Sequence, residues 1–302
     1  MISPPNLVKG DCIIIAAPGG KVVPGELEPA IELIKRFGYK VKLADNLFST
    51  HHSYLSGLDQ ERLADFQKAV DDDSVKAIFC ARGGYGTTRI IDQLDWSVFE
   101  RNPKWIVGFS DITALHLELA KRNIQSVHGI MPKLISVDDS GISTKSLFDV
   151  LMNNPQEIIA SPVVRNRLGT TSGIVIGGNL SLIVESIGTQ SEIDFADKIL
   201  VIEELNEYKY KIDRMLNQLK RAGKLNKLKG LVVGYISEVQ DTERPFGESI
   251  EDIVFNSVGE HSYPVAFGFS IGHERPNFAW RHGSLMKLTV AEEMAKLSSD
   301  ID

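Results

Sequence analysis

A serine stands where this sequence is expected to pass from a strand to a helix. Residues 105–109 form an apolar run typical of a buried strand, Ser110 follows, and residues 111–122 have helical spacing. A sharp turn at such a junction exposes a serine hydroxyl and points helix N–H groups at the space in front of it. The same order arises when a serine caps a helix. Because residues 108–113 read Gly-Phe-Ser-Asp-Ile-Thr and not Gly-x-Ser-x-Gly, local pattern alone favours the cap.

Seven histidines could supply the general base that a nucleophilic serine needs. His273 follows Gly272 shortly after an apolar run at 264–269. The exit of a strand holds a side chain more rigidly than a long loop does, which suits a base. His128 ends a short strand expected over 125–128 and is a rival for the same role.

Two neighbouring glutamates could orient such a histidine. Glu203 and Glu204 end a strand expected over 198–204. Alternation along a strand puts them on opposite faces, so at most one of them can face a crevice. Glu207 is a third candidate, and all three residues could equally be surface acids at a frayed strand end.

A glycine-rich turn, Arg-Gly-Gly-Tyr-Gly, occupies residues 82–86 after an apolar run at 75–81. Its glycines either make a tight turn or let backbone N–H groups approach a ligand closely. The turn is not a phosphate loop, because no Gly-Lys-Ser/Thr follows it and the Gly-x-Gly-x-x-Gly pattern is incomplete. No Cys/His set has zinc spacing. We therefore expect neither a metal nor a cofactor.

Strand and helix signals alternate around these residues in the first half of the chain. Strands are expected over 12–17, 40–44, 75–81, 105–109 and 125–128, and helices over 26–36, 59–70, 87–94 and 111–122. Such repeats predict an α/β fold, with a parallel sheet covered by helices on both faces. Ligands of such sheets gather at the carboxyl ends of the strands. Because residues 82–86 and Ser110 both fall at such ends, we expect them to face one crevice.

The second half is α/β as well, but less regular. Residues 157–172 lack periodicity and are expected to link an N-terminal domain, 1–156, to a C-terminal domain, 173–302. In the C-terminal domain, strands are expected over 173–177, 198–204, 230–236, 264–269 and 284–290, and helices over 179–187, 210–222 and 249–258.

Bulk properties exclude several classes of protein. The 302 residues carry a net charge of −7 and no basic run, which argues against nucleic-acid binding. Cys12 and Cys80 lie in apolar runs and are expected to be buried thiols. No signal peptide is visible, and no run reaches the roughly 18 apolar residues of a membrane span. We expect a cytoplasmic protein that binds no membrane.

Several segments, taken in order, resemble the LD-carboxypeptidase family of serine peptidases, and the resemblance covers nearly the whole chain. The landmarks are Ala-Pro at 17–18, the run 81–86, the run 108–115, Gly-Gly-Asn-Leu at 177–180 with Gly-Thr at 188–189, Ile-Glu-Glu at 202–204 with the run 210–216, and Gly-His at 272–273. No single landmark is decisive, but the six in this order are very specific.

This resemblance implies a flavodoxin-like N-terminal domain joined to a smaller α/β C-terminal domain, with the active site between them. The family's Ser-Glu-His set maps onto Ser110, Glu203 and His273, with Glu204 as the alternative acid. The oxyanion hole would be formed by the backbone N–H groups of Gly84 and Asp111. A terminal carboxylate on the substrate needs a cation or hydrogen-bond donors. Arg82 is a candidate for this role, and the alternative is an arginine packed structurally near the turn.

The reaction implied is hydrolysis of the amide between an L-configured diamino acid centre and a terminal D-alanine, as in murein tetrapeptides during peptidoglycan recycling. A related branch of the family cleaves a peptidyl-nucleotide antibiotic and confers self-immunity. A non-catalytic ligand-binding protein on the same scaffold would leave Ser110 unreactive. An amidotransferase-like enzyme would need a cysteine at the turn, where Ser110 stands instead. The family often forms homodimers.

Two segments depart from the usual pattern of the family. Gly19 and Gly20 stand where a small hydroxyl residue usually follows the early proline, and residues 278–282 are also less typical. Trp280, in the second segment, is the tryptophan near the histidine motif that could stack on an adenine. Both segments are expected near the cleft, where they would alter substrate fit.

Overall fold

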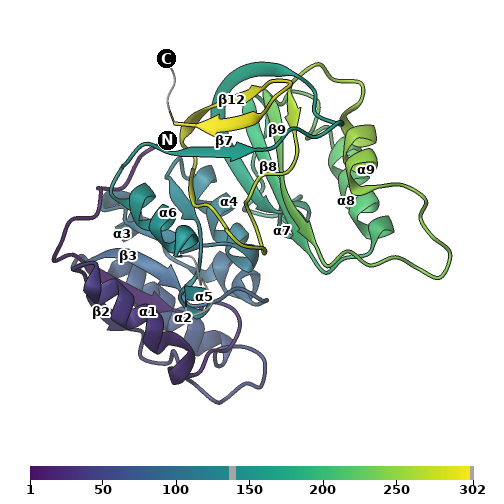
Figure 1. Ribbon diagram of the computed structural model, residues 1–302. Coiled ribbons are helices and arrows are strands. Elements are labelled where there is room, and N and C mark those ends of the chain that lie inside the picture. Colours follow the sequence, from purple (N-terminus) through teal and green to yellow (C-terminus); the bar gives the residue numbers. More distant parts are fainter. Residues whose placement is uncertain (136–140, 300–302) are drawn as a thin grey trace. The chain divides into compact units, whose positions relative to one another are not determined.

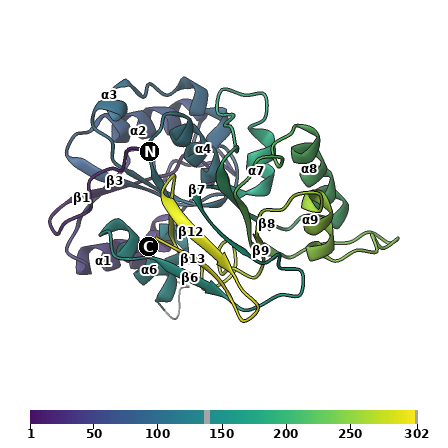
Figure 2. The ribbon, with the colours of Figure 1, turned by 90° about the horizontal axis from the view of Figure 1, so that it is seen from above.

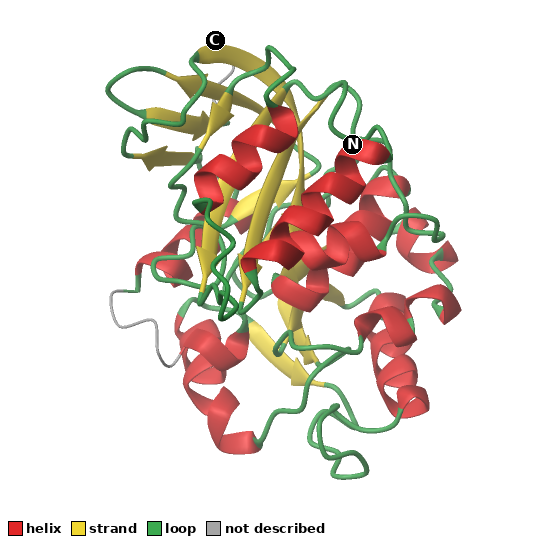
Figure 3. Ribbon diagram, turned by 90° about the vertical axis from the view of Figure 1, so that its right-hand side faces the viewer, coloured by secondary structure: helices red, strands yellow, loops and turns green. Residues whose placement is uncertain are grey.

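The computed structural model describes residues 1–135 and 141–299. The chain divides into two compact units (Figure 1). The N-terminal unit comprises Met1–Asn154 together with Phe278–His282. The C-terminal unit comprises Pro155–Asn277 and Gly283–Asp302. Both units contain helices and strands (Figure 3).

The N-terminal unit is built on a six-stranded sheet with the order β11-β5-β4-β3-β1-β2. Its strands are β1 (Cys12–Ala16), β2 (Lys40–Leu43), β3 (Val75–Cys80), β4 (Trp105–Gly108), β5 (Ser126–His128) and β11 (Trp280–His282). Strands β1 to β5 are parallel, in the order 2-1-3-4-5 of a doubly wound, flavodoxin-like sheet. The predicted fold class is therefore confirmed for this unit.

Helices lie on both faces of this sheet, with α2, α3 and α4 on one face and α1 and α6 on the other (Figure 2). The helices are α1 (Pro24–Arg36), α2 (Asp59–Asp71), α3 (Ser97–Arg101), α4 (Thr113–Lys121), α5 (Pro132–Ile135) and α6 (Ile142–Leu151), and three 3₁₀ turns are η1 (Thr87–Arg89), η2 (Ile91–Gln93) and η3 (Ser110–Ile112). The helix predicted over 87–94 is replaced by η1 and η2. Strand β3 is buried along nearly its whole length, which accounts for its apolar sequence.

Strand β11 comes from far along the chain and pairs antiparallel with β5, with Trp280 opposite His128. This strand is not among those expected from the sequence. All three of its residues are buried. The departure from the family pattern at 278–282 therefore falls largely on core residues of the sheet, and Trp280 does not line a cleft.

The C-terminal unit holds a seven-stranded sheet with the order β10-β9-β8-β7-β12-β13-β6. Its strands are β6 (Glu157–Ala160), β7 (Gly169–Asn179), β8 (Lys198–Leu205), β9 (Gly230–Ser237), β10 (Val265–Ala266), β12 (Leu285–Val290) and β13 (Ala295–Ser298), and its helices are α7 (Leu180–Glu185), α8 (Lys209–Arg221) and α9 (Ile250–Val258). Strands β7 to β10 are parallel, whereas β12, β13 and β6 are antiparallel. Residues 157–172, expected to be a linker, contribute β6 and the start of β7.

None of the helices in the described part of the chain combines the length and the apolar character that a membrane crossing requires.

Candidate active site

Ser110 occupies a strained turn between β4 and α4. Its backbone φ is +63°, in the left-handed region that a residue with a side chain rarely adopts. The residues that cap η3 and α4 are Phe109 and Ile112, so Ser110 caps neither helix. Its side chain is partly exposed. This geometry, a left-handed serine between a buried strand and a helix, is that of a nucleophile elbow.

The glycine-rich turn after β3 lies directly against this serine. A Cβ atom at Gly83 would come within 2.9 Å of the Cβ and 3.1 Å of the Oγ of Ser110, so only glycine fits there. Gly84 follows with a φ of +98° and is exposed. The structure therefore brings the two sequence-predicted turns of the N-terminal unit together.

Asp111 fixes the relative position of these two turns through its carboxylate. Its Oδ2 accepts hydrogen bonds from the backbone N of Thr87 at 3.0 Å and from the Oγ1 of Thr87 at 2.6 Å. Burial raises the pKa of Asp111, and the hydrogen bonds from Thr87 oppose that rise.

The close approach of three turns explains the two glycines that depart from the family pattern. A Cβ at Gly19 would lie 2.6 Å from the Oδ2 of Asp111, and one at Gly20 would lie 2.7 Å from the carbonyl oxygen of Gly83. The backbone N of Gly20 donates to that same carbonyl at 3.0 Å. Substituting either glycine would therefore displace the turns beside Ser110 and not merely reshape a surface.

Two arginines hold the same turns. Arg82 is partly exposed, and its Nη1 donates to the carbonyl oxygen of Lys21 at 3.1 Å. Arg62, which the sequence analysis missed, is fully buried, and its Nη1 donates to the carbonyl of Gly86 at 2.8 Å and to that of Pro18. Because α2 contains many polar residues, the sequence does not distinguish a buried arginine in it from an exposed one.

In the C-terminal unit, Glu203 and His273 form a buried pair. The Nδ1 of His273 lies 2.7 Å from the Oε2 of Glu203, whose side chain is fully buried. Gly272, with a φ of +124°, lets the chain pass over the carboxylate, because a Cβ there would lie 2.9 Å from that Oε2. A Glu–His pair of this geometry can orient an imidazole and stabilise its protonated form.

Burial and charge act in opposite directions on this pair. Burial raises the pKa of Glu203, and the hydrogen bond from His273 partly opposes this. Burial lowers the pKa of His273, but the hydrogen bond and charge of Glu203, aided by Glu204 and Glu238, outweigh it and raise the pKa overall.

The carboxylate of Glu204 is held by donors from the end of β7, from the first turn of α7 and from β8 itself. Its two carboxylate oxygens accept hydrogen bonds from the Nδ2 of Asn179 at 2.9 Å, from the N and Oγ of Ser181 at 2.8 and 2.6 Å, and from the N of Leu205 at 2.9 Å. Glu207 pairs with Lys211 at 3.1 Å. Of the three predicted acids, Glu203 is therefore the one that pairs with His273.

His128, the rival base, lies in the core of the N-terminal unit. It is fully buried, and its ring stacks on that of Trp280 at 5.3 Å between centroids. His116 and His282 are also fully buried, with ring centroids 5.4 Å apart. These three histidines pack inside the sheet and are not positioned as a solvent-facing base.

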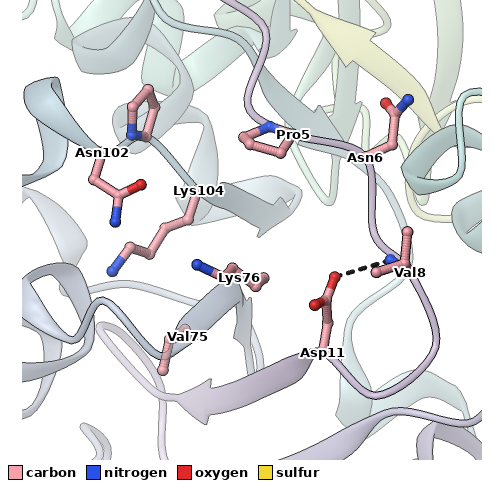
Figure 4. Close-up of a pocket in the computed structure, with 9 residues that line it drawn as sticks. Pro5, Asn6, Val8, Asp11, Val75, Lys76, Asn102 and Lys104 are labelled. Atoms are coloured by element: carbon pink, nitrogen blue, oxygen red, sulfur yellow. Dashed lines mark hydrogen bonds between the residues drawn. The ribbon is translucent and has the colours of Figure 1, made fainter.

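A pocket of about 220 Å³ opens at the other end of the same sheet (Figure 4). It is lined by Asp11, Val75 and Lys104, which precede or begin β1, β3 and β4, whereas Ser110 follows β4. The Nζ of Lys104 donates to the carbonyl of Asp72 at 2.7 Å. This pocket is distinct from the serine turn.

Within residues 1–135 and 141–299, no group of three His, Cys, Asp or Glu side chains is arranged to hold a metal ion. The N-terminal unit carries Ser110, Gly84, Asp111 and Arg82. The C-terminal unit carries Glu203 and His273.

A doubly wound sheet with a left-handed serine after β4, in a chain that also carries a buried Glu–His pair, has the parts of a serine peptidase. The chain belongs to the LD-carboxypeptidase family. Residues 13–129 match the family model of the LD-carboxypeptidase N-terminal domain, and residues 172–288 match that of the LD-carboxypeptidase C-terminal domain.

Individual relatives extend over almost the whole chain. A probable murein peptide carboxypeptidase from Bacillus subtilis (strain 168) is 36% identical over 303 residues, which cover 99% of this chain and 95% of that protein. The crystal structure of muramoyltetrapeptide carboxypeptidase from Oxalobacter formigenes has a TM-score of 0.87 at 28% identity, covering 95% of this chain and 98% of that one. The microcin C7 self immunity protein MccF, in complex with aspartyl sulfamoyl adenosine, has a TM-score of 0.84 with 99% of each chain covered. At 18% identity, that likeness shows the fold alone.

Proposed function

We propose that this protein is a serine LD-carboxypeptidase that removes the terminal D-alanine from murein tetrapeptides. The observation that carries the proposal is the buried hydrogen bond of 2.7 Å between Glu203 and His273, in a family member that also holds Ser110 in a left-handed turn. The murein peptide named for the B. subtilis relative supports the choice of substrate.

The attack on the scissile carbonyl uses Ser110 and His273. When the Nδ1–H of His273 donates to Glu203, its Nε2 is left to accept the Oγ proton of Ser110 as the oxygen attacks. The negative oxygen of the tetrahedral intermediate is held by the backbone N–H groups of Gly84 and Asp111. His273 then donates its proton to the leaving amine of D-alanine, and water releases the acyl group by the reverse steps.

Glu203 keeps the histidine in the productive tautomer. Its full burial makes the hydrogen bond strong, and the raised pKa of His273 shows the direction of the effect: the carboxylate favours the imidazolium that forms during attack. The assignment of Glu203 over Glu204 rests on this contact, since Glu204 is already occupied by Asn179, Ser181 and Leu205.

The two domains divide this machinery. We assign the nucleophile to a domain of residues 1–156 and the Glu–His pair to a domain of residues 173–302, with residues 157–172 joining them. The family matches at 13–129 and 172–288 support this division. Arg82, beside the serine turn, is the proposed partner of the carboxylate of the terminal D-alanine.

The remaining assignments follow from the substrate and from the sequence. We assign the protein to the cytoplasm. We further propose that it is a homodimer, acts without a cofactor, and binds neither nucleic acid nor a membrane. The net charge of −7 supports the absence of nucleic-acid binding.

Mass spectrometry of cleaved peptides tests the proposal. Purified protein is incubated with a murein tetrapeptide ending in D-alanine, with the same peptide ending in L-alanine, and with a peptidyl nucleotide. The proposal predicts loss of alanine from the D-peptide alone, and no loss with Ser110→Ala or His273→Ala. Cleavage of the peptidyl nucleotide in place of the tetrapeptide would establish the self-immunity reaction. Trp280, the tryptophan near the histidine motif, is fully buried, which argues against its stacking on a nucleotide base.

A further inference from the structure

The carboxylate of Asp111 joins two turns that the proposed reaction uses together. One turn carries the backbone N–H of Asp111 itself, and the other carries that of Gly84, three residues before Thr87. The Oδ2 of Asp111 accepts from both the N and the Oγ1 of Thr87, at 3.0 and 2.6 Å. One side chain on the serine turn is therefore anchored to the base of the glycine-rich turn.

We propose that the side chain of Asp111 is a positioning residue that sets the spacing of the two oxyanion donors. This inference rests on the proposed function, because it assumes that Ser110 is the nucleophile and that both N–H groups face the oxyanion. The donors lie on separate loops, which follow β3 and β4. A donor displaced by about 1 Å loses much of its effect on the transition state.

The packing around the contact transmits any movement of Thr87 to the serine. Gly83 fits against Ser110 with no space for a Cβ, and Gly84 follows it directly. On the opposite side, buried Arg62 donates to the carbonyl of Gly86 at 2.8 Å. The glycine-rich turn is thus held at its Gly86–Thr87 end by one cation and one carboxylate, two to three residues beyond Gly84.

The burial of Asp111 argues for a role beyond stability. Only 1% of the residue is exposed, and burial raises the pKa of its carboxyl group. A raised pKa means that the ionised carboxylate is disfavoured by folding, so at neutral pH the charge itself subtracts from stability. A costly buried charge that orders two functional loops is typical of a site in which stability is given up for activity.

A matched residue in the same unit separates positioning from structure. Asp65, on α2, is also buried, has a pKa raised by burial, and accepts two hydrogen bonds from Asn46, at 2.8 and 2.9 Å. Neither Asp65 nor Asn46 belongs to the serine turn or to the glycine-rich turn. Asp65→Ala therefore removes a comparable buried carboxylate without touching the proposed oxyanion hole.

Two readouts test the proposal: steady-state cleavage of the murein tetrapeptide, and the rate at which a fluorophosphonate labels Ser110. The phosphoryl oxygen of that probe occupies the oxyanion hole, so its rate reports on the hole without depending on the peptide. We expect Asp111→Ala to lower kcat and the labelling rate by about 100-fold with KM changed less than about threefold, because a misplaced donor costs nearly as much as a lost one. Asp65→Ala should leave both rates unchanged.

Variants of Thr87 test the contact more gently, because they keep the buried carboxylate. Thr87→Ser retains both donors and should keep the wild-type rates, whereas Thr87→Val loses the hydroxyl and should lower kcat about tenfold. The double variant Asp111→Ala with Thr87→Val should be no slower than Asp111→Ala alone, since both changes act through one contact.

The outcomes distinguish the inference from the function on which it rests. Unchanged rates in Asp111→Ala and Thr87→Val, with Ser110 labelled normally in the wild type, would overturn the positioning role alone. Equal losses in Asp65→Ala and Asp111→Ala would also overturn it, since any buried carboxylate would then matter as much. Wild-type protein that is not labelled at Ser110 would overturn the proposed function and the inference together.

Discussion

Replacing His116 should remove a measurable part of the acid sensitivity of the N-terminal unit. His116 is fully buried, and its Nε2 lies 2.9 Å from the carbonyl oxygen of Gly108, two residues before the proposed nucleophile. Because a carbonyl only accepts, Nε2 carries the proton and Nδ1 accepts from the Oγ of Ser126 at 2.7 Å. The rings of His128 and His282 pack beside it, so a charge on His116 has no acid to meet it among its ring neighbours.

The size of the effect follows from the pKa of this histidine. Burial lowers the pKa of His116 from 6.5 to about 4, and the hydrogen bond to Gly108 only partly opposes it. The neutral ring is thus favoured by folding, so its contribution to stability is complete above pH 6.5 and is lost as the pH falls toward 4. The linkage relation gives a loss of about 2 kcal/mol at pH 5 and about 3 kcal/mol at pH 4.

Urea unfolding at pH 7 and pH 5, followed by tryptophan fluorescence, measures this loss. All three tryptophans, Trp96, Trp105 and Trp280, belong to the N-terminal unit, so the signal reports that unit. In His116→Gln the difference in unfolding free energy between the two pH values should be smaller than in the wild type by about 2 kcal/mol. An unchanged difference in His116→Gln would refute the reasoning.

Three further predictions follow from contacts in the two units. Glu203→Gln should lower kcat by about 10³- to 10⁴-fold, because His273 would no longer be held in the productive tautomer. Glu204→Gln should mainly lower the midpoint of thermal unfolding. Equal losses of kcat in steady-state assays of the two variants would contradict the assignment of Glu203 as the orienting acid. Gly83→Ala, whose Cβ would lie 2.9 Å from that of Ser110, should lower kcat about 100-fold, and a wild-type kcat would show that the turn can move. Cys80, whose pKa is raised by full burial, should resist iodoacetamide in folded protein and react in urea. Rapid alkylation of Cys80 in folded protein would show that its thiol is accessible.

The parts of the fold that follow local rules could be predicted from the sequence. The central strands β3 and β4 of the first sheet are largely apolar and buried, and the turn at Ser110 follows β4. The carboxyl ends of parallel strands meet at one edge, so the closeness of residues 82–86 to Ser110 could also be predicted. Their roles in the reaction stay predictions.

Features that depend on distant partners could not be predicted in this way. Strand β11 has three residues, and it is a strand only because Trp280 and His282 pair with β5, about 150 residues earlier in the chain. Its entry into the sheet also explains why histidines that looked available from the sequence are buried.

The choice between the two glutamates shows the same limit. Alternation along β8 required Glu203 and Glu204 to face opposite ways, but not which of them meets a histidine. That choice depends on the chain after β10, where Gly272 passes over Glu203, and on α7, whose first turn occupies Glu204. Neither of these contacts can be predicted from the residues beside the glutamates.

Mapping of the covalent adduct of a fluorophosphonate tests whether Ser110 and His273 form one catalytic site. After labelling, the protein is digested and the modified peptide is identified by mass spectrometry, with Ser110→Ala and His273→Ala treated in parallel. The account predicts a single adduct on Ser110, no adduct in Ser110→Ala and much slower labelling in His273→Ala. An adduct on another residue, or wild-type labelling in His273→Ala, would contradict the claim that these two residues form one catalytic site.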